Sequence, residues 1–201
     1  MKTKELPYFY INNSFGGSQN WFLDPWMHIG GCGALTMCDL MIYMALYKDL
    51  PEGYPYDIDR LTKRAYKKFG THMRPYLRPR EEGIKDLETF IDGAETYLHY
   101  SHINRIRLRP FAGTNSVTDA KAAVIDSIDN GFPVPMLLLK HQDPKYDFFE
   151  WHWFLIVGYT ASEDGFQIKV ATYGKAHWLD FEEFWDTGFK ERGGLVLVSQ
   201  R

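Results

Sequence analysis

The stretch that decides the fold is HIGGCGALTMCDLMIYMALY, residues 28–47. Downstream of its first cysteine, only Thr36, Asp39 and Tyr43 interrupt an apolar pattern that reaches nearly all the way round a helix. A helix that is hydrophobic on most sides lies buried in a protein core. The stretch therefore predicts a buried central helix over residues 33–47, near the N-terminus.

Helical and strand patterns are segregated on either side of the middle of the chain. The first half favours helices, whereas the second half alternates as short strands joined by turns such as SEDG at 162–165. We predict helices over 57–70, 79–100 and 118–131, the last capped by Thr118, and a short helix over 180–188 opened by Asp180. We predict strands over 103–110, 133–140, 152–159, 165–172 and 194–200.

This segregation predicts the α+β class, in one domain over residues 1–201. The buried N-terminal helix should pack against a curled antiparallel sheet built from the C-terminal half. A parallel βαβ arrangement is disfavoured because the last strands are joined by tight turns.

Composition and charge give the chain no general attraction to nucleic acid or membranes. Hydrophobic residues make up 45%, charged residues 24%, and the net charge is −3. Eight Lys and Arg residues fall within 60–80, which we interpret as a solvated helix face because no RNA-recognition motif accompanies them. The N-terminal residues lack the apolar core of a secretory signal, and no apolar run is long enough to span a bilayer. We expect a cytoplasmic protein that binds neither nucleic acid nor membrane.

The two cysteines, Cys32 and Cys38, are not expected to form a disulfide. Helical geometry turns residues six apart away from each other. The absence of a disulfide framework favours a reducing compartment. No C-x2-4-C or H-x3-5-H spacing accompanies either cysteine, so we expect no metal site and no cofactor.

Cys32 is a candidate nucleophile because it immediately precedes the predicted helix. The positive end of a helix dipole stabilises a thiolate, and its free N–H groups can bind a developing oxyanion. The neighbouring Gly31 leaves room for a substrate backbone. Cys38 lies inside the apolar helix and is interpreted as a core residue.

His152 is the candidate base. It opens the apolar strand HWFLIVGY and lies between Trp151 and Trp153. Such an aromatic setting partly desolvates an imidazole and makes its charge state adjustable. A thiol needs a base, and a histidine on the facing sheet could supply it.

This combination resembles the papain-like cysteine peptidase superfamily. Its members carry a catalytic histidine followed six and seven residues later by Gly-Tyr or Gly-Phe, as in His152 with Gly158 and Tyr159 here. The G-x-P-V motif at 131–134, upstream of the histidine strand, is similar to bacterial members related to double-glycine leader peptidases and staphopains.

The resemblance implies a papain-like fold and a set of site residues. Cys32 and His152 would be catalytic, and the imidazole-orienting Asn or Asp of the family falls at Thr172 or Tyr173. A threonine hydroxyl can accept from an imidazole N–H but cannot stabilise imidazolium as a carboxylate would. The oxyanion-hole glutamine would be Gln19, thirteen residues before the cysteine, with the adjacent asparagine as its rival.

Four tryptophans are candidates for an apolar substrate groove, with plain core packing as the alternative. They are Trp21, Trp26, Trp151 and Trp153. The implied function is a cysteine peptidase or amidase that attacks a peptide or a small amide or thioester. An acyltransferase using the same site, or a catalytically impaired binding module, remains an alternative.

Overall fold

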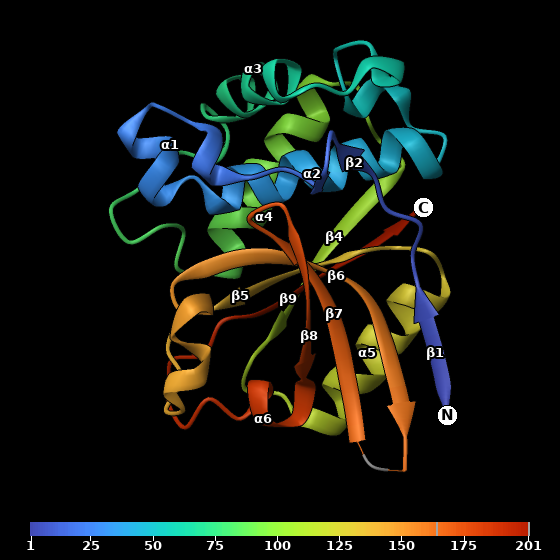
Figure 1. Ribbon diagram of the computed structural model, residues 1–201, viewed down its shortest axis with the longest axis vertical. Coiled ribbons are helices and arrows are strands. Elements are labelled where there is room, and N and C mark those ends of the chain that lie inside the picture. The colour runs from blue at the N-terminus through green and yellow to red at the C-terminus, as the bar shows by residue number, and fades with distance from the viewer. Residues whose placement is uncertain (164, 201) are drawn as a thin grey trace.

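A computed structural model describes residues 1–163 and 165–200. Asp164, in the predicted turn at 162–165, lies outside these residues. The chain is α+β, with helices gathered mainly above a sheet that is antiparallel throughout the pairs described (Figure 1).

The main sheet has seven strands in the order β4-β9-β5-β6-β7-β8, and β1 pairs separately with β6. Its strands are β1 (Lys2–Glu5), β4 (Ile106–Ala112), β5 (Val134–Leu138), β6 (His152–Ser162), β7 (Gly165–Thr172), β8 (Lys175–Asp180) and β9 (Gly194–Gln200). A small second sheet pairs β2 (Tyr10–Ile11) with β3 (Ser14–Phe15). The register pairs Leu155 with Ala171, which brings the start of β6 beside the end of β7.

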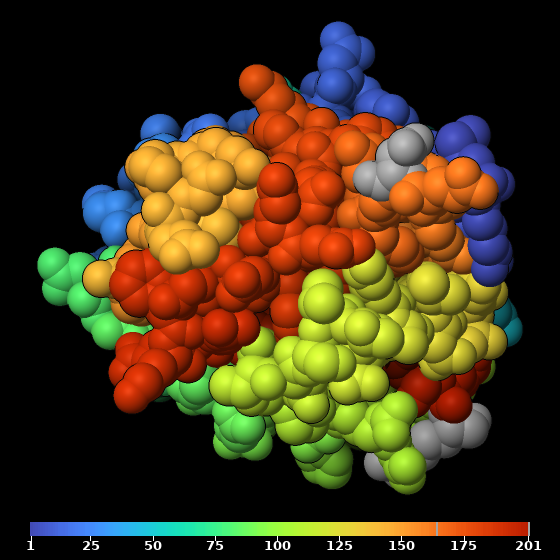
Figure 2. All heavy atoms as spheres, turned by 90° about the horizontal axis from the view of Figure 1, so that it is seen from below, coloured from blue at the N-terminus to red at the C-terminus, as the bar shows by residue number. Residues whose placement is uncertain are grey.

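The helices lie on two sides of this sheet. Above it are α1 (Pro25–Gly30), α2 (Cys32–Tyr47), α3 (Lys63–Met73) and α4 (Leu87–Tyr100). Below it are α5 (Val117–Asp129) and α6 (Phe181–Trp185), and short 3-10 turns fall at Gln19–Trp21, Pro51–Gly53, Ile58–Arg60 and Pro144–Phe149. Seen from below, α5 in yellow-green and the Pro144–Phe149 turn in gold cover much of this face (Figure 2).

The central helix is confirmed. Every residue of α2 from Cys32 to Met44 is buried, and the helix packs against β6 and α3. Because α2 is apolar on all sides, a central position is favoured, since it removes every side of the helix from contact with water. Burial of the polar Asp39 within it requires hydrogen-bond partners, which lie at the site described below.

Several local predictions were wrong. Residues 79–86 form a loop, and α4 begins only at Leu87, because Gly83 adopts a left-handed backbone (φ +67°) that a helix does not accommodate. The cap of α5 is Ser116, whose hydroxyl accepts from the Asp119 N–H, and not Thr118. Asp180 caps α6 as expected. The strand pattern of β8 and the short α1 were missed.

Candidate active site

Cys32 is the first residue of α2. Its N-cap is Gly31, which offers no side chain to the free N–H groups of the first turn. A Cβ at Gly31 would lie 2.4 Å from the Met27 carbonyl oxygen, so the glycine permits the tight junction between α1 and α2. The predicted role of Gly31 in admitting substrate stays a prediction, and its visible role is packing.

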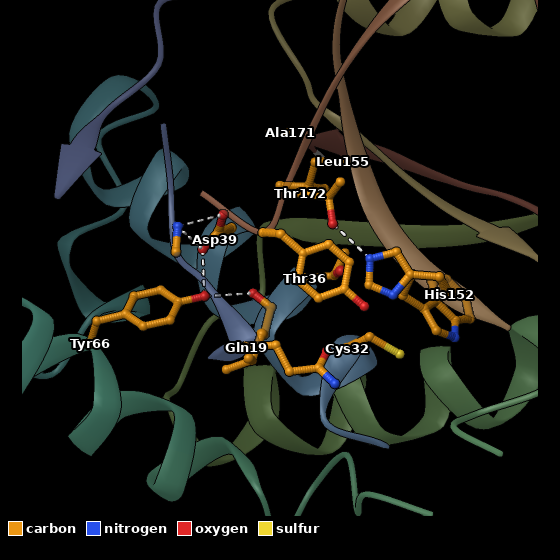
Figure 3. Close-up of a pocket in the computed structure, with 13 residues that line it drawn as sticks. Gln19, Cys32, Thr36, Asp39, Tyr66, His152, Leu155, Ala171 and Thr172 are labelled. Carbon is orange, nitrogen blue, oxygen red and sulfur yellow. Dashed lines mark hydrogen bonds between the residues drawn. The ribbon is translucent and has the colours of Figure 1, made fainter. Parts of the chain in front are cut away.

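His152 is held by the end of the neighbouring strand. Its Nε2 lies 2.6 Å from the Thr172 hydroxyl oxygen, and both side chains are buried. When Nε2 carries the ring proton it donates to Thr172, which leaves Nδ1 as a free acceptor. Figure 3 shows Nδ1 on the side of the ring that faces the Cys32 side chain.

Cys32 and His152, 120 residues apart in sequence, line one pocket. The pocket lies between α2 and strands β6 and β7, with a cavity volume of about 30 Å³, which is room for roughly one water molecule. Its lining residues are Gly17, Gln19, Cys32, Leu35, Thr36, Asp39, Tyr66, His152, Trp153, Leu155, Ala171, Thr172 and Tyr173.

The thiol and the imidazole are neutral in this closed site. Burial raises the pKa of the Cys32 thiol, and the backbone N–H groups of Trp153, Gly33 and Cys32 act against that rise. Burial also lowers the pKa of His152 to about 3. Within the described residues, the thiol is 4.0 Å from the Trp151 carbonyl oxygen and makes no hydrogen bond to the imidazole. Burial of both groups therefore favours the neutral thiol and imidazole over a thiolate–imidazolium ion pair.

Gln19 lines the pocket, whereas its rival Asn20 is exposed and does not. The Gln19 amide nitrogen donates to the His28 carbonyl oxygen at 2.5 Å. A carbonyl can only accept, so the amide must present its nitrogen there and its Oε1 elsewhere. That Oε1 is buried and has no hydrogen-bond partner among the described residues.

Asp39, two turns along α2 from Cys32, connects the loop before Gln19 to the helix by hydrogen bonds. Its carboxylate accepts from the Tyr66 hydroxyl at 2.7 Å, from the Tyr8 hydroxyl at 3.0 Å and from the Gly17 N–H at 3.2 Å. Burial raises the pKa of Asp39 to about 6, against the effect of these hydrogen bonds. The position of Asp39 in the apolar helix pattern is compatible with this burial, but the sequence does not identify its hydrogen-bond partners.

Tyr173 contacts the face of the imidazole. The two rings are 4.6 Å apart and nearly parallel, at 6°. The resemblance to the papain-like family left Thr172 and Tyr173 as alternatives for the position that orients the imidazole. The structure places Thr172 at an imidazole nitrogen and Tyr173 against the ring.

The tryptophans do not form one groove. Trp153 lines the pocket, but it is 1% exposed, stacks on Phe90 and donates to the Ile84 carbonyl oxygen at 2.7 Å. Trp151 contributes its backbone carbonyl beside Cys32. Trp21 packs edge-on against Tyr66, outside the pocket lining.

Trp26 is 51% exposed and lies beside a separate surface hollow with Arg74 and Arg78. The structure therefore does not bring Trp21 or Trp26 to the thiol, and their predicted contact with substrate there is not seen.

The 79–86 loop covers the thiol. A Cβ at Gly83 would lie 3.6 Å from both the Cys32 sulfur and the Trp151 carbonyl oxygen. The same loop is held down through Ile84, which accepts from the buried Trp153 indole. Sequence reasoning missed this cover because it assigned the segment to a helix.

Comparison with known proteins gave no relatives: no protein-family model matches the chain, and no curated protein matches it. None of the helices within residues 1–163 and 165–200 is long and apolar enough to cross a bilayer. In the same residues no three His, Cys, Asp or Glu side chains are grouped as metal ligands would be.

Proposed function

We propose that the protein is a cysteine hydrolase of papain-like fold, acting as a peptidase or amidase on an amide or thioester carbonyl. The observation that carries this proposal is the shared pocket of Cys32 and His152. The thiol stands at a helix N-terminus, and the imidazole presents Nδ1 toward it while Thr172 holds Nε2. This is the arrangement of a nucleophile, a base and a group that orients the base.

In the proposed reaction, Nδ1 of His152 takes the thiol proton and the sulfur attacks the carbonyl carbon. The backbone N–H groups at the start of α2 face the sulfur and are available to the oxyanion. His152 then returns its proton to the leaving amine or thiol, and a thioester remains on Cys32. Water attacks the thioester, releases the acid and restores the thiol.

The closed pocket sets a requirement on this reaction. A neutral thiol and a neutral imidazole must exchange a proton, and burial works against both resulting charges. Displacement of the 79–86 loop from Cys32 would admit substrate and water, and would move both pKa values back toward their ordinary ranges. We therefore expect slow turnover until a substrate displaces the loop.

The test uses p-nitrophenyl acetate, whose acetyl group is small. Acetylation forms the Cys32 thioester and releases p-nitrophenolate, which is followed by its colour, while peptide mass locates the acetyl group. We expect Cys32→Ala to abolish acetylation at this site and His152→Asn to slow it by roughly 10²-fold or more. Cys38→Ala, which changes a thiol deep in the same helix, is the matched control. Acetylation of Cys32 at an equal rate in His152→Asn would contradict the proposal.

Thr172 favours a second candidate, a binding module that keeps the fold without turnover. A neutral hydroxyl behind the imidazole gives no charge to stabilise imidazolium. For this candidate the same assay gives a Cys32 acetylation rate no higher than that of a free thiol, with no effect of His152→Asn. An acyltransferase would form the same thioester, and transfer of the acetyl group to an added primary amine in preference to water would identify it.

A further inference from the structure

Tyr173 occupies a backbone conformation that tyrosine rarely adopts. It has φ +49° and is followed by Gly174 at φ +75°, so both residues of the two-residue turn between β7 and β8 are left-handed. Such turns strongly favour Asn-Gly or Asp-Gly. A bulky residue held in this region carries strain, and such strain concentrates at functional sites.

The strained turn places the Tyr173 ring in the candidate active site. The ring stacks on His152 and also contacts Phe148 at 5.2 Å between ring centroids. It thereby covers one face of the imidazole. An aromatic ring alone would suffice for this contact, so the stack does not explain why the residue is tyrosine.

The hydroxyl group is what distinguishes tyrosine from phenylalanine. Within the described part of the chain the Tyr173 hydroxyl has no hydrogen-bond partner, and the residue lines the pocket with Cys32. Burial first, and then the negative charge of a thiolate at Cys32, raises the pKa of Tyr173 to about 12. The hydroxyl therefore stays protonated at neutral pH, in a residue that shares the pocket with Cys32.

The other side-chain donor expected in this pocket, Gln19, is partly committed elsewhere. One N–H of its amide donates to the His28 carbonyl oxygen and its buried Oε1 can only accept, so a single N–H is left over. The remaining titratable groups that line the pocket are Asp39 on α2, Tyr66 on α3 and His152 on β6. Tyr66 already donates to Asp39, so it is not free to stabilise a thiolate.

We propose that Tyr173 is a further catalytic residue whose hydroxyl donates a hydrogen bond to the Cys32 thiolate. The proton leaving the sulfur goes to Nδ1 of His152, while Tyr173 keeps its own proton and only shares it. The strained turn brings the Tyr173 phenol from the β7–β8 hairpin into the pocket that Cys32 lines. This inference rests on the same site as the proposed hydrolase but needs no turnover.

The test is the pH dependence of Cys32 alkylation by iodoacetamide, in which the thiolate forms a sulfur–carbon bond and iodide leaves. Peptide mass separates Cys32 from Cys38. In Tyr173→Phe the ring stack is kept and the hydroxyl is lost. We expect the alkylation profile to move to higher pH and the rate at pH 8 to fall about tenfold or more, as for one lost hydrogen bond to a charged group.

Two further variants keep the result interpretable. Tyr43→Phe removes a hydroxyl from the same central helix, where it donates to the Gly131 carbonyl oxygen at 2.9 Å outside the pocket, and should leave the profile unchanged. Tyr173→Asn suits the left-handed turn and should show the same shift as Tyr173→Phe if the latter folds poorly.

An unchanged profile in both Tyr173 variants, or an equal shift in Tyr43→Phe, would overturn the inference. Neither result bears on acetylation of Cys32. Conversely, a shifted alkylation profile without acetylation of Cys32 would refute the proposed hydrolase but support the hydrogen bond from Tyr173 to the Cys32 thiolate.

Discussion

Replacement of His152 by glutamine should flatten the pH dependence of folding stability below pH 7. Burial lowers the pKa of His152 to about 3, whereas the unfolded chain titrates near the ordinary value of 6.5. Between these values the unfolded state binds more protons than the folded state. The wild-type protein therefore loses stability as pH falls through 6.5, and the variant does not lose this share.

The size of the effect follows from the two pKa values. Between pH 7.5 and pH 5 the His152 contribution to the free energy of unfolding falls by about 2 kcal/mol. Urea unfolding gives the free energy of unfolding of both proteins at both pH values. The change with pH in the variant is subtracted from the change in the wild type, so that the contributions of all other titrating groups cancel. A loss of stability in His152→Gln that is equal at both pH values cancels in this comparison.

Equal losses in the wild type and in His152→Gln would refute the reasoning. They would mean that the imidazole is hydrated or charge-paired in the folded protein, and that burial does not keep His152 neutral. Direct titration of the imidazole by NMR in the wild type provides a second measurement. A His152 signal that titrates near pH 6.5 would lead to the same rejection.

Three further outcomes are expected. Asp39 should affect the pH dependence of stability in the opposite direction to His152. Its folded pKa is raised to about 6, above the unfolded value of 3.8. Its contribution to the free energy of unfolding is therefore present below pH 3.8 and is lost as pH rises through 6. Relative to Asp39→Asn, the wild type should gain about 1 kcal/mol in its free energy of unfolding by urea on going from pH 7.5 to pH 5. No relative gain would contradict the burial of this carboxyl. Gly83→Ala should cost about 1 kcal/mol in thermal unfolding because its backbone is left-handed, and an unchanged Tm would show that the loop rearranges freely. Ser116→Ala should lower the free energy of unfolding by about 1 kcal/mol through loss of the α5 cap, whereas Thr118→Ala, inside the helix, should be near neutral. A larger loss in Thr118→Ala than in Ser116→Ala would identify Thr118 as the cap.

The sequence was sufficient for features that depend on one local pattern. The burial of α2 follows from apolar residues on every side of one helix, and no knowledge of its neighbours was needed. The β6 and β7 strands follow in the same way from short apolar runs bounded by turns. The place of Cys32 at the start of α2 was also read correctly from the flanking glycines.

Features that depend on distant partners were not accessible in this way. The 79–86 loop has helix-like composition, and only its packing on Trp153 and beside Cys32 reveals it as a cover. Asp39 meets Tyr8 and Tyr66 from two separate segments, which no spacing in the sequence indicates. The desolvation that neutralises the thiol and the imidazole likewise depends on everything that surrounds them.

The long sequence separation between the walls of the pocket has a consequence for protein synthesis. Cys32 leaves the ribosome 140 residues ahead of Thr172, a delay of about 7 to 28 s at usual elongation rates. Throughout that interval the nascent chain carries Cys32 without His152, Thr172 and Tyr173, which line the pocket with it in the folded protein. The pocket around Cys32 is therefore completed only after the C-terminal hairpin has been made and has docked.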